Sequence, residues 1–118
     1  MHAIRLAVLS LALMAGAATA HAHAYLDHAN PLVGSTVKSS PSEVRMWFTQ
    51  ALEPKFTAAQ LRSSAGAVVA TGGVDAADPR QIVIRVRALP PGYYKVFWKV
   101  LSVDAHHTEG SFGFEVKP

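Results

Sequence analysis

Apolar and polar side chains alternate with a period of two in several short segments of this chain of 118 residues. The pattern is clearest in residues 44–49 and 81–87, where every second side chain is apolar. Because successive side chains of a β-strand point to opposite faces, this alternation predicts strands with one buried face. Turn residues such as Pro90–Gly92 separate the runs, and no segment after residue 25 has a helical period. The chain is therefore predicted to be all-β, an antiparallel β-sandwich of about seven short strands with an immunoglobulin-like architecture.

The predicted core consists of apolar side chains that share one face of these strands. Its expected members are Val44, Met46, Phe48, Ile82, Ile84, Trp98, Phe112 and Phe114. Trp47 is expected in the core as well, because large aromatic side chains bury much apolar area. Residues 71–78 are polar and rich in glycine, so a loop is expected there.

The N-terminal residues have the pattern of a secretion signal. Residues 4–18 are almost wholly apolar, but the run is too short and ends too abruptly for a good transmembrane span. Small residues then recur at every second position, which allows cleavage after Ala20, Ala22 or Ala24. Export across a membrane is therefore expected.

Two of these three cleavage sites leave a histidine, His21 or His23, at the mature N-terminus. An N-terminal histidine offers a metal two nitrogens, its free amine and its ring. The pKa of an α-amino group is about 8, so a metal displaces its proton at little cost near neutral pH. The alanine-histidine alternation is equally explained by the needs of signal peptidase.

Removal of the signal leaves enough residues for one small domain. The chain has no cysteine, which excludes zinc-thiolate, iron-sulfur and blue-copper sites. The formal net charge is +3 and the basic residues are scattered, so a nucleic-acid partner is not expected.

Asp104 and His106 lie two residues apart between two strand-like runs. In an extended backbone, residues with this spacing point to the same face, about 6.5 to 7 Å apart along the strand. Asp104 and His106 are therefore expected to converge on one ion, and His107 to face away. The motif is common, and an ordinary polar surface loop is the alternative.

Five blocks of the sequence occur in an order and spacing that are specific in combination. They are residues 23–31, 33–37, 47–54, 89–96 and 98–106. Together they resemble the CopC family of bacterial periplasmic copper-binding proteins, in its YobA-like branch. The resemblance implies a β-barrel-like or cupredoxin-like sandwich with Greek-key connections, the fold of a CopC domain.

The resemblance also implies a set of Cu(II) ligands. Members of the family bind the ion through the mature N-terminal histidine and an Asp-x-His motif, which matches Asp104 and His106 here. They carry a leucine and a proline at fixed distances from the N-terminus, and Leu26 and Pro31 meet that spacing when His23 is the first residue.

Cleavage after Ala22 is the cut that this resemblance selects. It gives a signal peptide of residues 1–22 and a CopC-like copper-binding domain of residues 23–118. Many members have a second histidine two residues after the first, where this chain has Tyr25, unless cleavage exposes His21 instead.

Nitrogen and oxygen donors dominate the implied site. Met46 is the sole methionine outside the signal, so the sulfur-rich Cu(I) site of some members is not expected. One amine, two imidazoles and a carboxylate suit a single tetragonal Cu(II) ion, and the N-terminal chelate disfavours tetrahedral zinc.

The function implied is that of a periplasmic copper carrier or buffer in copper homeostasis or resistance, not an enzyme. By analogy with the family, it would pass copper to a CopD-type inner-membrane protein, and it would bind no substrate polymer. One alternative is a copper-dependent oxidase of the lytic monooxygenase type, although Asp104 would occupy the position that such enzymes keep for oxygen. Another is a metal-free immunoglobulin-like interaction module. The role of His28 stays open.

Overall fold

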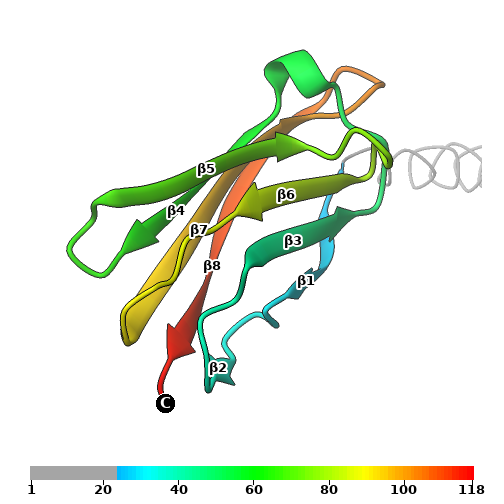
Figure 1. Cartoon of the computed structure of the whole chain (residues 1–118). Helices are drawn as coiled ribbons and strands as arrows, with labels where there is room; N and C mark the ends of the chain where they lie inside the picture. The colour runs from blue at the N-terminus through cyan, green and yellow to red at the C-terminus, as the bar shows by residue number, and fades with distance from the viewer. Residues whose placement is uncertain (1–23) are drawn as a thin grey trace, which may run out of the picture.

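The computed structural model describes residues 24–118, which form eight strands and one short 3-10 helix (Figure 1). The strands are β1 (Leu26–Asn30), β2 (Thr36–Val37), β3 (Glu43–Phe48), β4 (Ala58–Ser63), β5 (Val68–Val74), β6 (Gln81–Arg85), β7 (Gly92–Leu101) and β8 (His107–Val116). The helix η2 spans Pro54–Phe56. The predicted all-β class is confirmed, with eight strands rather than about seven. Within residues 24–118, no helix has the length and apolar character needed to cross a membrane.

The strands form one sheet in the order β1-β3-β6-β5-β4-β7-β8-β2. β4, β5 and β6 follow one another as neighbours, β3 lies beside β6, and β7 lies beside β4. These arrangements are two overlapping Greek keys. All pairs are antiparallel except β2 with β8, which the antiparallel prediction missed.

The two edge strands of this sheet, β1 and β2, are joined by the short segment 31–35. A chain of that length spans at most about 20 Å. The sheet must therefore curl until its edges approach each other, as Figure 1 shows. The curled sheet encloses its core between two facing layers, which is the sandwich expected from the sequence.

All eight residues of the predicted core are buried. Trp98 and Phe48 meet edge to face, with ring centroids 5.1 Å apart. The expectation for Trp47 is wrong: it is only partly buried, and it stacks on His28 with the ring planes 11° apart and the centroids 4.4 Å apart. Because β3 turns its even-numbered residues inward, Trp47 has to face outward.

The loop predicted for residues 71–78 is also only partly correct, because β5 continues to Val74. Gly72 pairs with Ile84, and a Cβ at Gly72 would lie 2.1 Å from the carbonyl oxygen of Val83. The glycine thus permits the close approach of two strands, rather than a turn.

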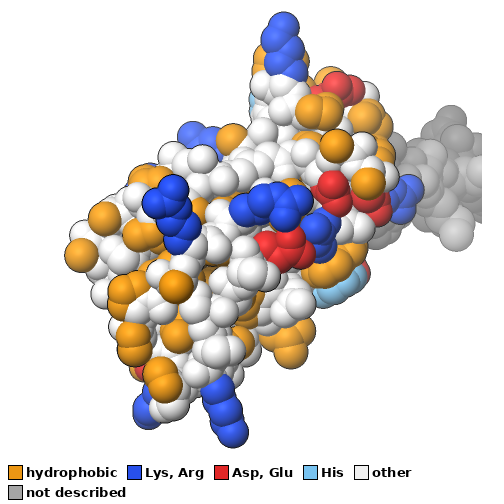
Figure 2. Space-filling model, viewed as in Figure 1, with side chains coloured by type: hydrophobic (Ala, Val, Ile, Leu, Met, Phe, Trp, Pro, Cys, Tyr) orange, Lys and Arg blue, Asp and Glu red, His pale blue; other side chains and the backbone are white. Residues whose placement is uncertain are grey.

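Charged side chains lie on the outside of the sandwich. On the face seen in Figure 2, Lys and Arg are dispersed, with Asp and Glu between some of them. Arg45, for example, forms two ion pairs: its Nε lies 3.1 Å from Oε1 of Glu43, and its Nη1 lies 2.6 Å from Oδ2 of Asp75.

Candidate metal centre

The hairpin turn between β7 and β8 carries the Asp-x-His motif. The N–H of Ser102 donates to the carbonyl of His106 at 3.0 Å, and the N–H of Ala105 donates to the carbonyl of Ser102 at 2.9 Å. Ala105 has a φ of 69°, the left-handed conformation that completes a three-residue hairpin loop. Asp104 therefore lies in a turn, and the assumption of an extended backbone around the motif is wrong.

The turn nevertheless brings the two predicted ligands together. Oδ1 of Asp104 lies 3.4 Å from Nδ1 of His106, and the side chains are 39% and 43% exposed. Both side chains are thus partly exposed at the surface, but Nδ1 of His106 is itself buried.

Ser102 connects the side chain of Asp104 to the backbone of His106. It is fully buried, its hydroxyl donates to Oδ1 of Asp104, and its Oγ accepts the backbone N–H of His106 at 3.2 Å. Sequence reasoning did not single out Ser102. A serine two residues before an aspartate in a loop is a recognisable turn signal, since such hydroxyls bond to nearby groups.

The electrostatic surroundings keep Asp104 ionised. The hydroxyl of Ser102 lowers the pKa of this carboxyl most, and the hydrogen bond and charge of His106 lower it further. Partial desolvation acts in the opposite direction but does not prevail. The carboxylate therefore carries a negative charge at neutral pH, the form that attracts a cation.

The first described residues approach this hairpin. Oγ1 of Thr108 donates to the carbonyl of Ala24 at 2.7 Å, and Ala24 is fully buried. On the other side, the N–H of Tyr25 donates to Oγ1 of Thr49 at 2.9 Å. The chain at Ala24 is therefore fixed between β3 and β8, close to His106. Thr108 is a second residue that sequence reasoning did not identify, because its partner lies 84 residues away.

The remaining candidates occupy separate places. His23 and its alternative His21 lie outside the described residues. His107 is exposed at the start of β8, and Met46 is fully buried in the core. Within residues 24–118, no three His, Cys, Asp or Glu side chains form a group able to hold a metal ion.

His28 lies on β1 and is 53% exposed. Its Nδ1 is 2.7 Å from Oδ2 of Asp27, and its ring stacks on Trp47. The described contacts of His28 are therefore with Asp27 and Trp47, not with Asp104 or His106.

Comparison with known proteins confirms the family inferred from the sequence. The sequence model of the CopC domain matches residues 26–117. Protein YobA of Escherichia coli (strain K12) is 31% identical over 115 residues, which cover 95% of this chain and 91% of YobA. Copper resistance protein C of Escherichia coli is 34% identical over 121 residues, covering 94% of this chain and 95% of the relative. The crystal structure of CopC from Methylosinus trichosporium OB3b matches with a TM-score of 0.76 at 32% identity, covering 81% of this chain and 95% of that one. The chain therefore belongs to the CopC domain family, which includes copper resistance proteins.

Proposed function

We propose that this protein is a periplasmic carrier or buffer that binds one Cu(II) ion through His23, Asp104 and His106 and serves copper homeostasis or resistance. The observation that carries the proposal is the hydrogen bond from Thr108 to the carbonyl of Ala24. This bond ties Ala24 to Thr108, two residues along the chain from His106, and His23 directly precedes Ala24 in the sequence.

The described donors fit half of a copper site. Two ligands that each bind one ion at about 2 Å, at right angles to each other, lie about 3 Å apart. The 3.4 Å between Oδ1 of Asp104 and Nδ1 of His106 is close to that separation, and because Nδ1 is buried the imidazole ring would have to turn outward to bind an ion there. An N-terminal His23 would add an amine and an imidazole, which completes a donor set suited to tetragonal Cu(II).

The same chemistry disfavours Cu(I), which prefers several sulfur donors. Met46 is the sole methionine in residues 24–118 and is fully buried in the core. Two of the proposed ligands, Asp104 and His106, instead lie on a partly exposed hairpin, a position suited to transfer of an ion. We propose transfer to a CopD-type protein of the inner membrane and no enzymatic reaction. Asp104 would fill a coordination position that an oxygen-activating copper enzyme needs open.

The test is a copper titration of the mature protein beginning at His23, beside a version with one additional N-terminal glycine. The added residue converts the amine of His23 into an amide, a far poorer donor at neutral pH, and leaves every side chain in place. Affinity should fall by several orders of magnitude. Equal affinities would show that the amine is no ligand, and mass spectrometry of the exported protein would identify the residue that is truly N-terminal.

A further inference from the structure

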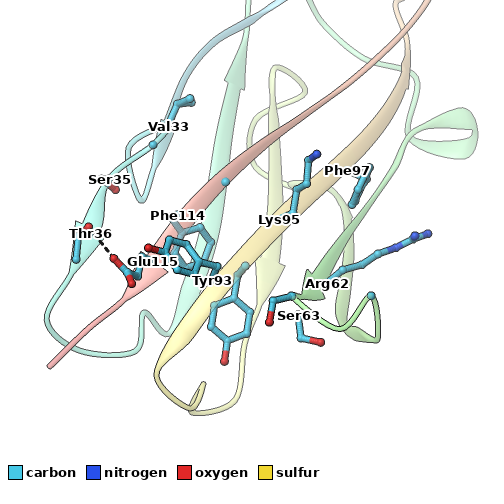
Figure 3. A pocket seen from close by; sticks show the side chains of 15 residues that line it. Val33, Ser35, Thr36, Arg62, Ser63, Tyr93, Lys95, Phe97, Phe114 and Glu115 are labelled. Carbon is cyan, nitrogen blue, oxygen red and sulfur yellow. Dashed lines mark hydrogen bonds between the residues drawn. The ribbon is translucent and has the colours of Figure 1, made fainter.

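A groove of about 770 Å³ lies on the sheet, over the first half of β7 and the last half of β8 (Figure 3). One wall is formed by residues 33–36, which include the start of β2. The other is formed by residues 62–64 and 66, at the end of β4 and in the β4–β5 turn. Its volume lies within the range of ligand-binding sites. The proposed copper site does not use this groove.

Exposed apolar side chains reach into this groove. Strand alternation turns Tyr93, Lys95 and Phe97 of β7 outward, and Tyr93 is 66% exposed. Val33, on the wall formed by residues 33–36, is 58% exposed. An aromatic ring and an aliphatic side chain thus offer uncovered apolar surface on the floor and on one wall of the groove.

Two cations line the side of the groove nearest β4. The guanidinium carbon of Arg62 lies 4.8 Å from the centroid of Phe97, and Nζ of Lys95 lies 5.4 Å from it. Among residues 24–118, no carboxylate lies within ion-pair distance of either cation, and Arg62 instead donates to Oε1 of Gln60 at 2.9 Å. The carboxylate that lines the groove, Glu115, accepts from the hydroxyl of Thr36 at 3.4 Å.

We propose that this groove binds an extended acidic segment of a partner protein. Its carboxylates pair with Arg62 and Lys95, and an apolar side chain of the segment packs against Tyr93 and Val33. Tyrosine and arginine are among the residue types that most often dominate binding energy at protein interfaces. The two cations supply the charge complementarity that selects an acidic partner.

Other ligand classes fit this groove less well. Two walls stand beside Tyr93, so a flat bilayer would not reach the floor between them. Nucleic-acid binding depends largely on cations that neutralise several phosphates at once, and two cations are few for this purpose. A sugar would need a free aromatic face, and Arg62 and Lys95 lie over that of Phe97.

The groove covers the first half of β7, and the Asp104–His106 hairpin follows the end of this strand. Tyr93 and Phe97 precede Leu101 by eight and four residues, which is about 26 Å and about 13 Å at 3.3 Å per residue. Peptide binding therefore does not depend on the proposed copper site, and failure of one proposal leaves the other standing.

The experiment is an NMR titration of the ¹⁵N-labelled mature protein with a blocked peptide, Gly-Glu-Tyr-Asp-Glu-Gly. A matched peptide in which Gln and Asn replace the acidic residues is the control ligand. The acidic peptide should shift the amide signals of Gly34, Gly66 and Gly113, which line the groove. The neutral peptide should bind at least tenfold more weakly, and added salt should weaken the acidic peptide further.

Two charge-reversal variants separate local recognition from net charge. R62E/K95E should bind the acidic peptide at least tenfold more weakly than the wild type. R85E/R87E makes the same change in net charge at exposed positions outside the groove, and it should bind like the wild type. Tyr93→Ser tests the apolar contact without a change of charge and should weaken binding several-fold.

Three results would overturn the proposal. One is the absence of saturable shifts at millimolar peptide. Another is an equal loss of binding in the two charge-reversal variants. The third combines two observations: the wild type binds phosphatidylglycerol vesicles and R62E/K95E does not, while the acidic peptide causes no shifts in the groove. This result would mean that the two cations bind a lipid surface instead of a peptide. Unchanged dispersion of the amide spectra verifies that each variant is folded.

Discussion

Ser102→Ala should weaken copper binding although the side chain is fully buried and is not itself a proposed ligand. The change removes the hydroxyl that donates to Asp104 and the acceptor of the N–H of His106. Loss of a supporting group of this kind typically lowers metal affinity about 10- to 100-fold. We expect a loss of about tenfold at neutral pH, where Asp104 stays ionised without this bond.

The pH dependence of this variant follows from the pKa of Asp104. The hydroxyl of Ser102 is the main cause of the lowered pKa, so its removal raises that pKa toward the ordinary value of a carboxyl. Protons then compete with copper at a higher pH than in the wild type. The loss of affinity should therefore be greater at about pH 4 than at about pH 7, because an ordinary carboxyl begins to be protonated appreciably only near its pKa of about 3.9.

The assay is titration with Cu(II) against a competing chelator at both pH values, with unfolding by urea measured in parallel. Ser111→Ala, at an exposed position on β8, is the matched control and should match the wild type. Ser102→Thr keeps the hydroxyl and should retain more affinity than Ser102→Ala. Ser102→Ala should also lower the free energy of unfolding by about 1 to 3 kcal/mol, because a buried hydrogen-bonding group disappears. Wild-type affinity at both pH values would refute the idea that Ser102 positions the ligands.

Trp98→Ala should lower the free energy of unfolding by roughly 3 to 5 kcal/mol, measured with urea, because the indole is buried against Phe48; a loss below about 1 kcal/mol would contradict this packing. Asp75→Asn should destabilise the protein near neutral pH, because the N–H of Ala77 and then Arg45 lower the pKa of Asp75 in the folded state. This contribution is present above the unfolded pKa of about 3.9 and is lost as pH falls through the lower folded value, so wild type and variant should converge in strong acid, and a constant difference across a pH series would exclude the effect. Competition with a Cu(I) chelator should reveal no tight Cu(I) site, and tight binding that Met46→Ala abolishes would overturn the preference for Cu(II).

The strands and the core were predictable from local alternation. Val44, Met46 and Phe48 repeat every second residue and are buried as expected. The same alternation places Trp47 on the outer face, where it stacks on His28. The prediction for Trp47 failed because it relied on the size of the aromatic side chain, whereas the odd-numbered residues of β3 all face outward.

Other parts of the fold depend on partners distant in the sequence. β5 contains glycines that resemble a loop when read alone, and only its pairing with β6 shows why Gly72 is needed. The parallel pair of β2 and β8 joins segments from opposite ends of the domain. No local pattern of two residues encodes such a pair.

The amino-acid sequence alone was enough for the all-β class, eight core residues and the family, and it predicted Asp104 and His106 as metal donors. Only the tertiary structure decided that these donors meet through a hairpin turn held by Ser102, and that Thr108 fixes Ala24 beside them. Strand periodicity is encoded within a few consecutive residues, so sequence alone reveals it. A contact across 84 residues depends on how every intervening strand pairs and on how the sheet closes, and that information exists only in the folded chain.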